Sequence, residues 1–179
     1  MCEVRVVPRE GKNGIRLFVS RDAQVAYKIL RNGQKIDVRG TRTTTQNSKV
    51  RYNARRKQRY LKYAHALGKD QNILVSHAVY LAWVGPIPEG YVVDHLNGVT
   101  TDNRAENLEA ITPKENVRRV PYLHALRKLI PNHWQTFGRE DYLRFYGMPL
   151  AEFKAMLSKF RRANPQALME YEMTHHCEC

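Results

Sequence analysis

Cysteine is scarce in this sequence. The chain has 3 cysteines in 179 residues, and Cys2, Cys177 and Cys179 all lie close to its two ends. Disulfide-rich scaffolds and cysteine-based metal sites need cysteines at paired spacings within the folded part of the chain. The cysteine positions therefore suggest a protein of a reducing compartment without a disulfide framework.

Long apolar runs are also absent. A membrane-spanning helix needs about 20 consecutive apolar residues, and no stretch of this chain approaches that length. No charged segment followed by an apolar one opens the chain, as it would in a secretory signal. We therefore expect a soluble, cytoplasmic protein without a membrane partner.

Acidic residues are few. The chain has 17 Asp and Glu against 30 Lys and Arg, which gives a net charge of +13 and a pI of about 9.9. This excess favours a polyanionic partner, because neutralising phosphates releases their condensed counterions. Charge alone does not separate a nucleic-acid enzyme from a ribosomal protein. The length of 179 residues fits one domain, or one small domain with appendages.

Residues 77–119 carry the side chains with the clearest chemistry. Asp94 and His95 close a short apolar run, and Asn107 and Asn116 follow within the same stretch. A carboxylate can bind a hard cation, an imidazole can accept a proton, and an amide offers a neutral oxygen ligand. Metal-assisted hydrolysis of a phosphodiester needs this combination, since the metal stabilises developing charge while the base deprotonates the attacking water.

The same stretch resembles a known family. Its lead-in reads GPIPEGYVVDHLNG, an Asn-Leu pair stands at Asn107 and Leu108, and TPKEN ends at Asn116. These features resemble the HNH endonuclease family, in the phage-type branch whose last motif histidine is an asparagine. The intervals between His95, Asn107 and Asn116 also fit the family's strand–loop–strand–helix motif. The resemblance covers roughly residues 75–119 and implies an α+β fold around a ββα-metal core.

The resemblance implies a role for each of four residues. Asp94 is similar to the family's first metal ligand, and Asn116 to its second. His95 is similar to the general base, and Asn107 to the middle asparagine that ties the loop to the backbone and holds the base in orientation. Because the last position is Asn in place of His, the ligands suit Mg²⁺, with Mn²⁺ as the second choice, better than zinc or nickel. The implied products carry a 5′-phosphate and a 3′-hydroxyl.

Taken singly, these polar residues also have ordinary structural interpretations. An Asp before a turn usually caps a loop, and a lone His after a strand is usually packed or solvated. Asn tolerates left-handed backbone and bonds its own chain, so we interpret Asn97 and Asn103 as turn formers without chemistry. We interpret His77 as structural or phosphate-facing.

Three parts are predicted along the chain. They are an N-terminal β-rich basic module at 1–56, the HNH domain at 57–120 and a C-terminal helical region at 121–179. In the first two parts we expect several strands, a linker and a helix that starts at Ser76 as its N-cap. The expected segments are strands at 3–7 and 15–20, a strand or short helix at 24–30, a loop or linker at 40–48, a hairpin at 60–75 and a helix at 77–83.

The second half of the chain carries clear helix signals. Thr112 with Glu115 forms a capping box, and Pro113 occupies the first helical position. The apolar spacing at 122–130 is amphipathic, and two further helices are expected at 139–146 and 150–162. Their short glycine-containing connection is typical of a helix-turn-helix DNA-binding unit and equally of an ordinary helix pair.

Basic residues group in three places, and we predict that they contact nucleic acid. A solvated basic face is the competing interpretation. The predicted contacts are Arg51, Arg55, Arg56, Lys57, Arg59, Arg118, Arg119, Lys159, Arg161 and Arg162.

These observations favour a metal-dependent DNA endonuclease that acts on double-stranded DNA through a His-activated water. We expect a monomer without a small-molecule substrate, in a bacterial or phage-infected cell. The resemblance implies a phage or mobile-element homing role. One alternative is a non-catalytic DNA-binding regulator on an HNH scaffold. Another is a basic RNA- or ribosome-associated protein, which explains the charge but not the Asp94, His95 and Asn116 set.

Overall fold

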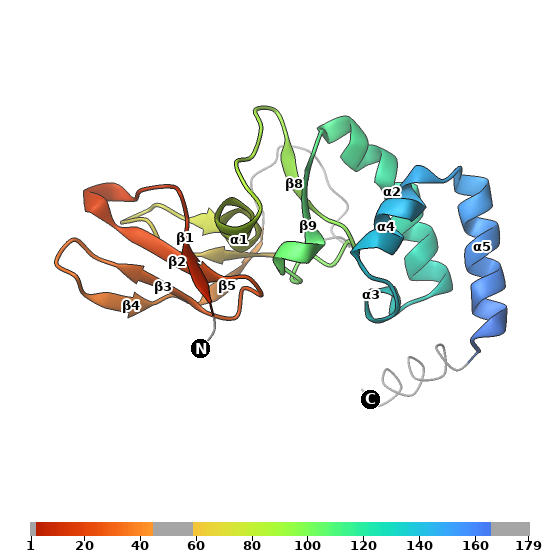
Figure 1. Ribbon diagram of the computed structural model, residues 1–179, viewed down its shortest axis with the longest axis horizontal. Coiled ribbons are helices and arrows are strands. Elements are labelled where there is room, and N and C mark those ends of the chain that lie inside the picture. Colours follow the sequence, from red (N-terminus) through yellow and green to blue (C-terminus); the bar gives the residue numbers. More distant parts are fainter. Residues whose placement is uncertain (1–2, 45–58, 166–179) are drawn as a thin grey trace. The chain divides into compact units, whose positions relative to one another are not determined.

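The computed structural model describes residues 3–44 and 59–165 (Figure 1). The chain divides into two compact units. Unit 1 comprises Met1–His95 and Val99–Ala110, and unit 2 comprises Leu96–Gly98 and Ile111–Cys179. Strands and helices are both present, so the α+β class predicted from the sequence is confirmed. The division at 1–56, 57–120 and 121–179 stays a prediction.

Sheet A opens unit 1 and is antiparallel, in the order β1-β2-β3-β4. Its strands are β1 (Val4–Val6), β2 (Arg16–Ser20), β3 (Ala26–Ile29) and β4 (Lys35–Asp37). A 3₁₀ turn, η1 (Lys12–Gly14), precedes β2. Of residues 24–30, for which the sequence allows a strand or a short helix, Ala26–Ile29 form the strand β3. The turn between β3 and β4 is closed by the hydrogen bond from Leu30 N to Gln34 O at 2.9 Å, with Gly33 at φ 84°.

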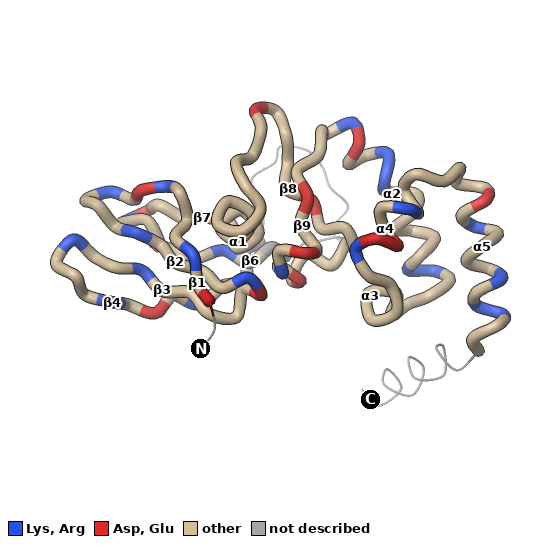
Figure 2. The backbone as a smooth tube through the Cα atoms, in the orientation of Figure 1, with Lys and Arg blue, Asp and Glu red and all other residues tan. Residues whose placement is uncertain are grey.

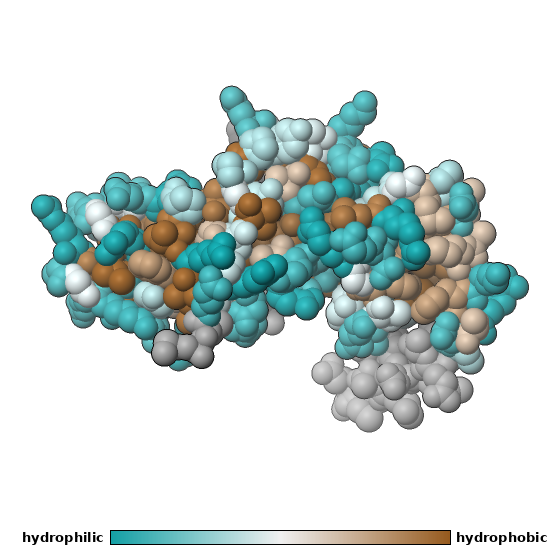
Figure 3. Space-filling model, viewed as in Figure 1, coloured by the Kyte–Doolittle hydropathy of each residue, from teal (hydrophilic) through white to brown (hydrophobic). Residues whose placement is uncertain are grey.

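The two faces of sheet A differ because strand side chains alternate. Leu17 and Val19 of β2 are fully buried. On the other face Phe18 stacks on its cross-strand partner Tyr27, with ring centroids 5.0 Å apart, and the Lys35 ammonium lies 4.1 Å from the centre of the Tyr27 ring. Apolar residues gather over this sheet in Figure 3, with hydrophilic residues around them.

Sheet B contains β5 (Gly40–Thr44), β6 (Arg59–Tyr63) and β7 (Ile73–Leu74), in that order. The prediction of a loop at 40–48 is wrong for Gly40–Thr44, which pair antiparallel with β6 along their whole length. Three of these five residues are threonines, whose branched side chains favour strands. The hairpin of β6 and β7 confirms the one expected at 60–75.

Helix α1 (Val75–Trp83) packs against β1, β2, β6 and β7 within unit 1. The predicted cap at Ser76 is wrong. Leu74 is the N-cap residue, without a side-chain hydrogen bond, and Ser76 lies inside the first turn with 3% of its surface exposed. Ala78 and Val79 are fully buried and join the core of unit 1.

The last elements of unit 1 carry the motif. Strand β8 (Val92–His95) and strand β9 (Leu108–Ile111) form a two-stranded sheet, and a 3₁₀ turn, η2 (Ala105–Asn107), leads into β9. The last two residues of β8 are Asp94 and His95. Residues 96–107 between the strands form the motif loop, which carries Asn97, Asn103 and Asn107.

Unit 2 is helical, with a core of Tyr, Phe and Leu side chains. Its helices are α2 (Pro113–Leu129), α3 (His133–Thr136), α4 (Arg139–Gly147) and α5 (Leu150–Ala163). Half of the predicted capping box is confirmed, since the Thr112 hydroxyl accepts from Glu115 N at 3.2 Å and Pro113 occupies the first turn. The Glu115 carboxylate instead pairs with Arg118 and Arg119. No sequence pattern predicted the short α3.

Helix α2 continues through Pro121. Proline lacks a backbone N–H, so the carbonyl four residues earlier loses its helical donor. That carbonyl belongs to Val117, which is 72% exposed, so water can satisfy it. The segment around Asn116 and the amphipathic segment at 122–130 therefore form one helix. Among the described residues, no helix is long and apolar enough to cross a membrane.

Candidate active site

Strand β8 places Asp94 and His95 at its C-terminal end, where the chain enters the motif loop. The two side chains have different surroundings. His95 is 3% exposed, whereas Asp94 is partly buried. An imidazole can accept a proton and a carboxylate can bind a cation, although the Oδ2 atom of Asp94 is itself buried.

Asn103 binds the ring of His95. Its Oδ1 lies 3.1 Å from His95 Nε2, and its own Nδ2 donates to the carbonyl oxygen of Thr101 at 3.2 Å. Asn103 is 4% exposed. The interpretation of Asn103 as a turn former alone is therefore incomplete, because its side chain also contacts the candidate base.

Burial lowers the pKa of His95 below its ordinary value of 6.5, since a charged imidazolium is poorly solvated there. The hydrogen bond to Asn103 and the charge of Asp102 act in the opposite direction. His77 on α1 also has a lowered pKa, caused first by burial and then by the charges of Arg9 and His95. The environment thus favours a neutral imidazole at His95.

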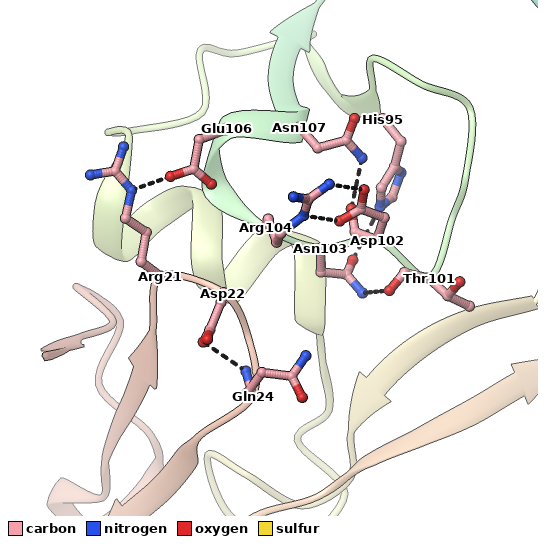
Figure 4. Close-up of polar contacts among 10 residues, drawn as sticks. All are labelled: Arg21, Asp22, Gln24, His95, Thr101, Asp102, Asn103, Arg104, Glu106 and Asn107. Carbon is pink, nitrogen blue, oxygen red and sulfur yellow. Dashed lines mark hydrogen bonds and ion pairs between the residues drawn. The ribbon is translucent and has the colours of Figure 1, made fainter. Parts of the chain in front are cut away.

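The loop that carries Asn103 is closed by its own hydrogen bonds (Figure 4). Asn107 Nδ2 donates to the carbonyl oxygen of Asp102 at 2.7 Å, and Asn107 N donates to Arg104 O at 2.9 Å. The Arg104 guanidinium forms two hydrogen bonds of 2.8 Å with the Asp102 carboxylate. These contacts fix the backbone on both sides of Asn103.

A second set of contacts fastens the loop to sheet A. The Arg21 guanidinium pairs with Glu106, as Figure 4 shows, and Ala105 N donates to Arg21 O at 3.0 Å. Ala105 and Leu108 are buried in the core of unit 1. The turn between β2 and β3, which contains Arg21, therefore supports the motif loop.

A pocket of about 320 Å³ lies beside this loop. Its lining includes Asp102 and Asn103 together with Asp22, Tyr63 and Val75. The Tyr63 hydroxyl is buried and makes no hydrogen bond, and burial raises its pKa to about 12. The pocket leaves space next to Asn103.

Asn116 lies near the start of α2 and is exposed. Asp94, His95 and Asn107 belong to unit 1 and Asn116 to unit 2, so the pairing of Asp94 with Asn116 on one metal ion stays a prediction. Among the described residues, no three His, Cys, Asp or Glu side chains form a group that could hold a metal ion. The predicted pair uses an asparagine, which lies outside those four residue types.

Glu115 organises the arginines that follow it. Arg118 forms hydrogen bonds of 2.6 and 2.8 Å with both oxygens of Glu115, and Arg119 Nε lies 3.1 Å from Glu115 Oε1. The hydrogen bond from Arg118, followed by that from Arg119, lowers the pKa of Glu115 to about 2. Arg118 keeps half of its side chain exposed, whereas Arg119 is 5% exposed and stacks on Tyr146 at 4.5 Å. Such burial opposes the predicted phosphate contact of Arg119.

The other predicted nucleic-acid contacts are only partly described. Lys159, Arg161 and Arg162 are exposed on α5, along which blue Lys and Arg positions recur in Figure 2. Arg59 begins β6, and its side chain is not described. The remaining four, Arg51, Arg55, Arg56 and Lys57, lie outside the described residues.

Residues 74–118 match the family model described as HNH endonuclease. Over this segment the chain is similar to HNH endonucleases. The matched segment includes α1, β8, the closed loop, β9 and the start of α2. It therefore contains His95, Asn103 and Asn107 as well as both predicted metal ligands.

The relative YosQ, an SPbeta prophage-derived protein of Bacillus subtilis (strain 168), is named as a candidate HNH homing endonuclease. It is 38% identical over 65 residues, which are 36% of this chain and 35% of the relative. The chain thus spans about a third of that relative's length. The solved structure on DNA binding and cleavage by the HNH homing endonuclease I-HmuI has 21% identity and a TM-score of 0.44, over 73% of this chain and 68% of that one.

Proposed function

We propose that the protein is a metal-dependent endonuclease that hydrolyses phosphodiester bonds in double-stranded DNA. One observation carries the proposal: a buried histidine ends β8 and is hydrogen-bonded to Asn103, within a segment that matches the HNH endonuclease family. His95 is the proposed general base. Because burial lowers its pKa, the imidazole is neutral near pH 7 and can take a proton from water.

The proposed cation ligands are Asp94 and Asn116. The donor set fits an oxygen-preferring ion, since it offers one carboxylate and one amide oxygen and leaves other positions to water and phosphate. Mg²⁺ is therefore the first candidate and Mn²⁺ the second. When bound, the cation would polarise the scissile phosphate and stabilise the leaving oxygen. Asn107 holds the loop in shape through the carbonyl of Asp102.

The DNA substrate is supported by the net charge of +13 and by the exposed cations of α5. YosQ is named as a candidate homing endonuclease, which supports a homing role on phage or mobile DNA. We propose a monomer that nicks one strand with its single site, whereas two copies together would cut both strands.

Conversion of supercoiled plasmid tests the proposal. The purified protein should nick the plasmid in Mg²⁺ or Mn²⁺ and not in EDTA, and His95→Ala should lose at least about 100-fold in rate, as expected for a general base. His124→Ala is the matched control, because His124 is an exposed histidine on α2. Cleavage by His95→Ala at the rate of the unmodified protein would refute the base assignment.

A non-catalytic DNA-binding regulator is the second candidate. It predicts that duplex DNA binds but is not cut in either metal, across a library that offers many target sites. Competition between duplex DNA and structured RNA separates both candidates from an RNA- or ribosome-associated protein, which would prefer the RNA.

A further inference from the structure

Two asparagines of the motif loop have different hydrogen-bond partners. Asn107 donates to the backbone carbonyl of Asp102, and so it shapes the loop. Asn103 contacts the imidazole itself, through its side-chain oxygen. Asn103, which the sequence patterns did not single out for chemistry, thus contacts the ring directly.

The orientation of the Asn103 amide is fixed by its second contact. Nδ2 donates to the carbonyl of Thr101 at 3.2 Å, and a flipped amide would bring two acceptor oxygens together there. Oδ1 must therefore face His95. An amide oxygen only accepts hydrogen bonds, so His95 Nε2 carries the proton. In a neutral imidazole Nδ1 is then the basic nitrogen.

We propose that Asn103 is a positioning residue of the general base, holding His95 as the Nε2-protonated tautomer so that Nδ1 accepts the proton of water. The inference rests on the proposed function for its catalytic part. Burial of both side chains, at 3% and 4% exposure, keeps water from competing for the bond. Asn103 acts on the reaction only through His95.

Two substitutions separate the ring contact from the loop contact. Asn103→Asp keeps an acceptor for His95 and loses the donor to Thr101, whereas Asn103→Leu, of similar size, loses both. Single-turnover cleavage at saturating DNA should fall about 10- to 100-fold in Asn103→Leu, the usual loss for an orienting hydrogen bond, with Kd for DNA unchanged. Asn103→Asp should recover most of that loss. Asn72→Leu is the matched control, because Asn72 in the same unit accepts from His65 N at 2.9 Å.

Two-bond ¹H–¹⁵N spectra of the histidine rings provide a readout that does not depend on cleavage. The His95 signal, assigned by its absence in His95→Ala, should show Nε2–H in the unmodified protein at a pH where the ring is neutral. A proton on Nδ1 overturns the inference, even if no cleavage is found.

If the protein cleaves DNA, two kinetic outcomes also overturn the inference. Equal loss of cleavage in both Asn103 variants would assign the effect to the Thr101 contact. Full activity in Asn103→Leu would show that the contact with His95 does not affect the reaction. A protein that never cleaves but shows Nε2–H would keep the tautomer assignment and remove only the nuclease function.

Discussion

Arg118 and Arg119 are neighbours in sequence with different surroundings. Both pair with Glu115, but Arg118 is half exposed while Arg119 is buried over the Tyr146 ring. A buried guanidinium that loses its partners is destabilising, whereas an exposed one is solvated. Arg118 also donates to the carbonyl oxygen of Tyr146 at 2.7 Å, but its exposure makes it the one of the two that a phosphate can reach.

Arg119→Met should lower the free energy of unfolding by about 1–3 kcal/mol, because it removes the ion pair with Glu115 and the contact with Tyr146. Urea denaturation measures this loss. The slope of DNA affinity against salt concentration should stay unchanged in this variant, since no phosphate contact is removed. For Arg118→Met we expect the reverse: the free energy of unfolding should fall less than in Arg119→Met, and the slope of DNA affinity against salt concentration should become flatter. If the slope of DNA affinity against salt concentration became flatter in Arg119→Met, Arg119 would contact a DNA phosphate after all.

At the scale of the element, the turn after β8 depends on one glycine. Gly98 has φ +66°, and its carbonyl accepts from Arg127 Nη2 at 2.8 Å. A Cβ at this position would lie 2.8 Å from Arg127 Nη2 and 3.0 Å from the Leu123 methyl groups. Both the backbone conformation and the close approach of α2 therefore require glycine.

Gly98→Ala should destabilise the protein by about 1–2 kcal/mol from the left-handed backbone alone, with a further loss from displacing Arg127. Gly147→Ala is the control, because no heavy atom lies within 4 Å of its Cβ position and its φ is not positive. The melting temperatures of the two variants provide the comparison. Equal melting temperatures for Gly98→Ala and Gly147→Ala would contradict the prediction and show that this turn accepts a side chain at residue 98.

Elements whose boundaries depend on neighbouring residues alone were predicted well from the sequence. Thr112, Pro113 and Glu115 define the start of α2 within four residues, so the sequence alone located it. Gly40–Thr44 could not be recognised as a strand, because its partner β6 lies beyond an intervening segment. Asp94 and His95 were found through the family motif. The contact of Asn103 with His95 depends on the loop conformation, and the burial of Arg119 depends on Tyr146, so neither could be predicted from spacing.

At the scale of the whole molecule, stability depends on pH through a histidine in the core of unit 2. His133 is fully buried, its Nδ1 lies 2.8 Å from the Tyr142 hydroxyl, and its Nε2 is buried without a hydrogen bond. Burial, followed by the charge of Arg127, lowers its pKa from 6.5 to about 4. Between pH 6.5 and about pH 4, His133 therefore binds a proton in the unfolded chain and stays neutral in the folded protein.

The stability contributed by neutral His133 is fully present above pH 6.5 and falls as the pH drops towards 4, by on the order of 3 kcal/mol. His133→Asn, whose amide can keep the contact with Tyr142, should flatten this part of the stability curve. His124→Asn, at an exposed histidine of α2, is the control substitution. Urea unfolding at pH 7 and pH 4.5 measures both. If the stability of His133→Asn fell between pH 7 and pH 4.5 as much as that of the unmodified protein, other groups would cause the acid sensitivity.

The division of the chain also restricts how this protein can be dissected or recombined. Leu96–Gly98 belong to unit 2, between two stretches of unit 1, and the backbone oxygen of Leu96 accepts from the Tyr146 hydroxyl. A fragment that begins at residue 111 would lack Leu96, which is fully buried in the helical core. The C-terminal helices are therefore not a detachable cassette. A chimera that exchanges them between relatives must carry residues 96–98 from the same parent.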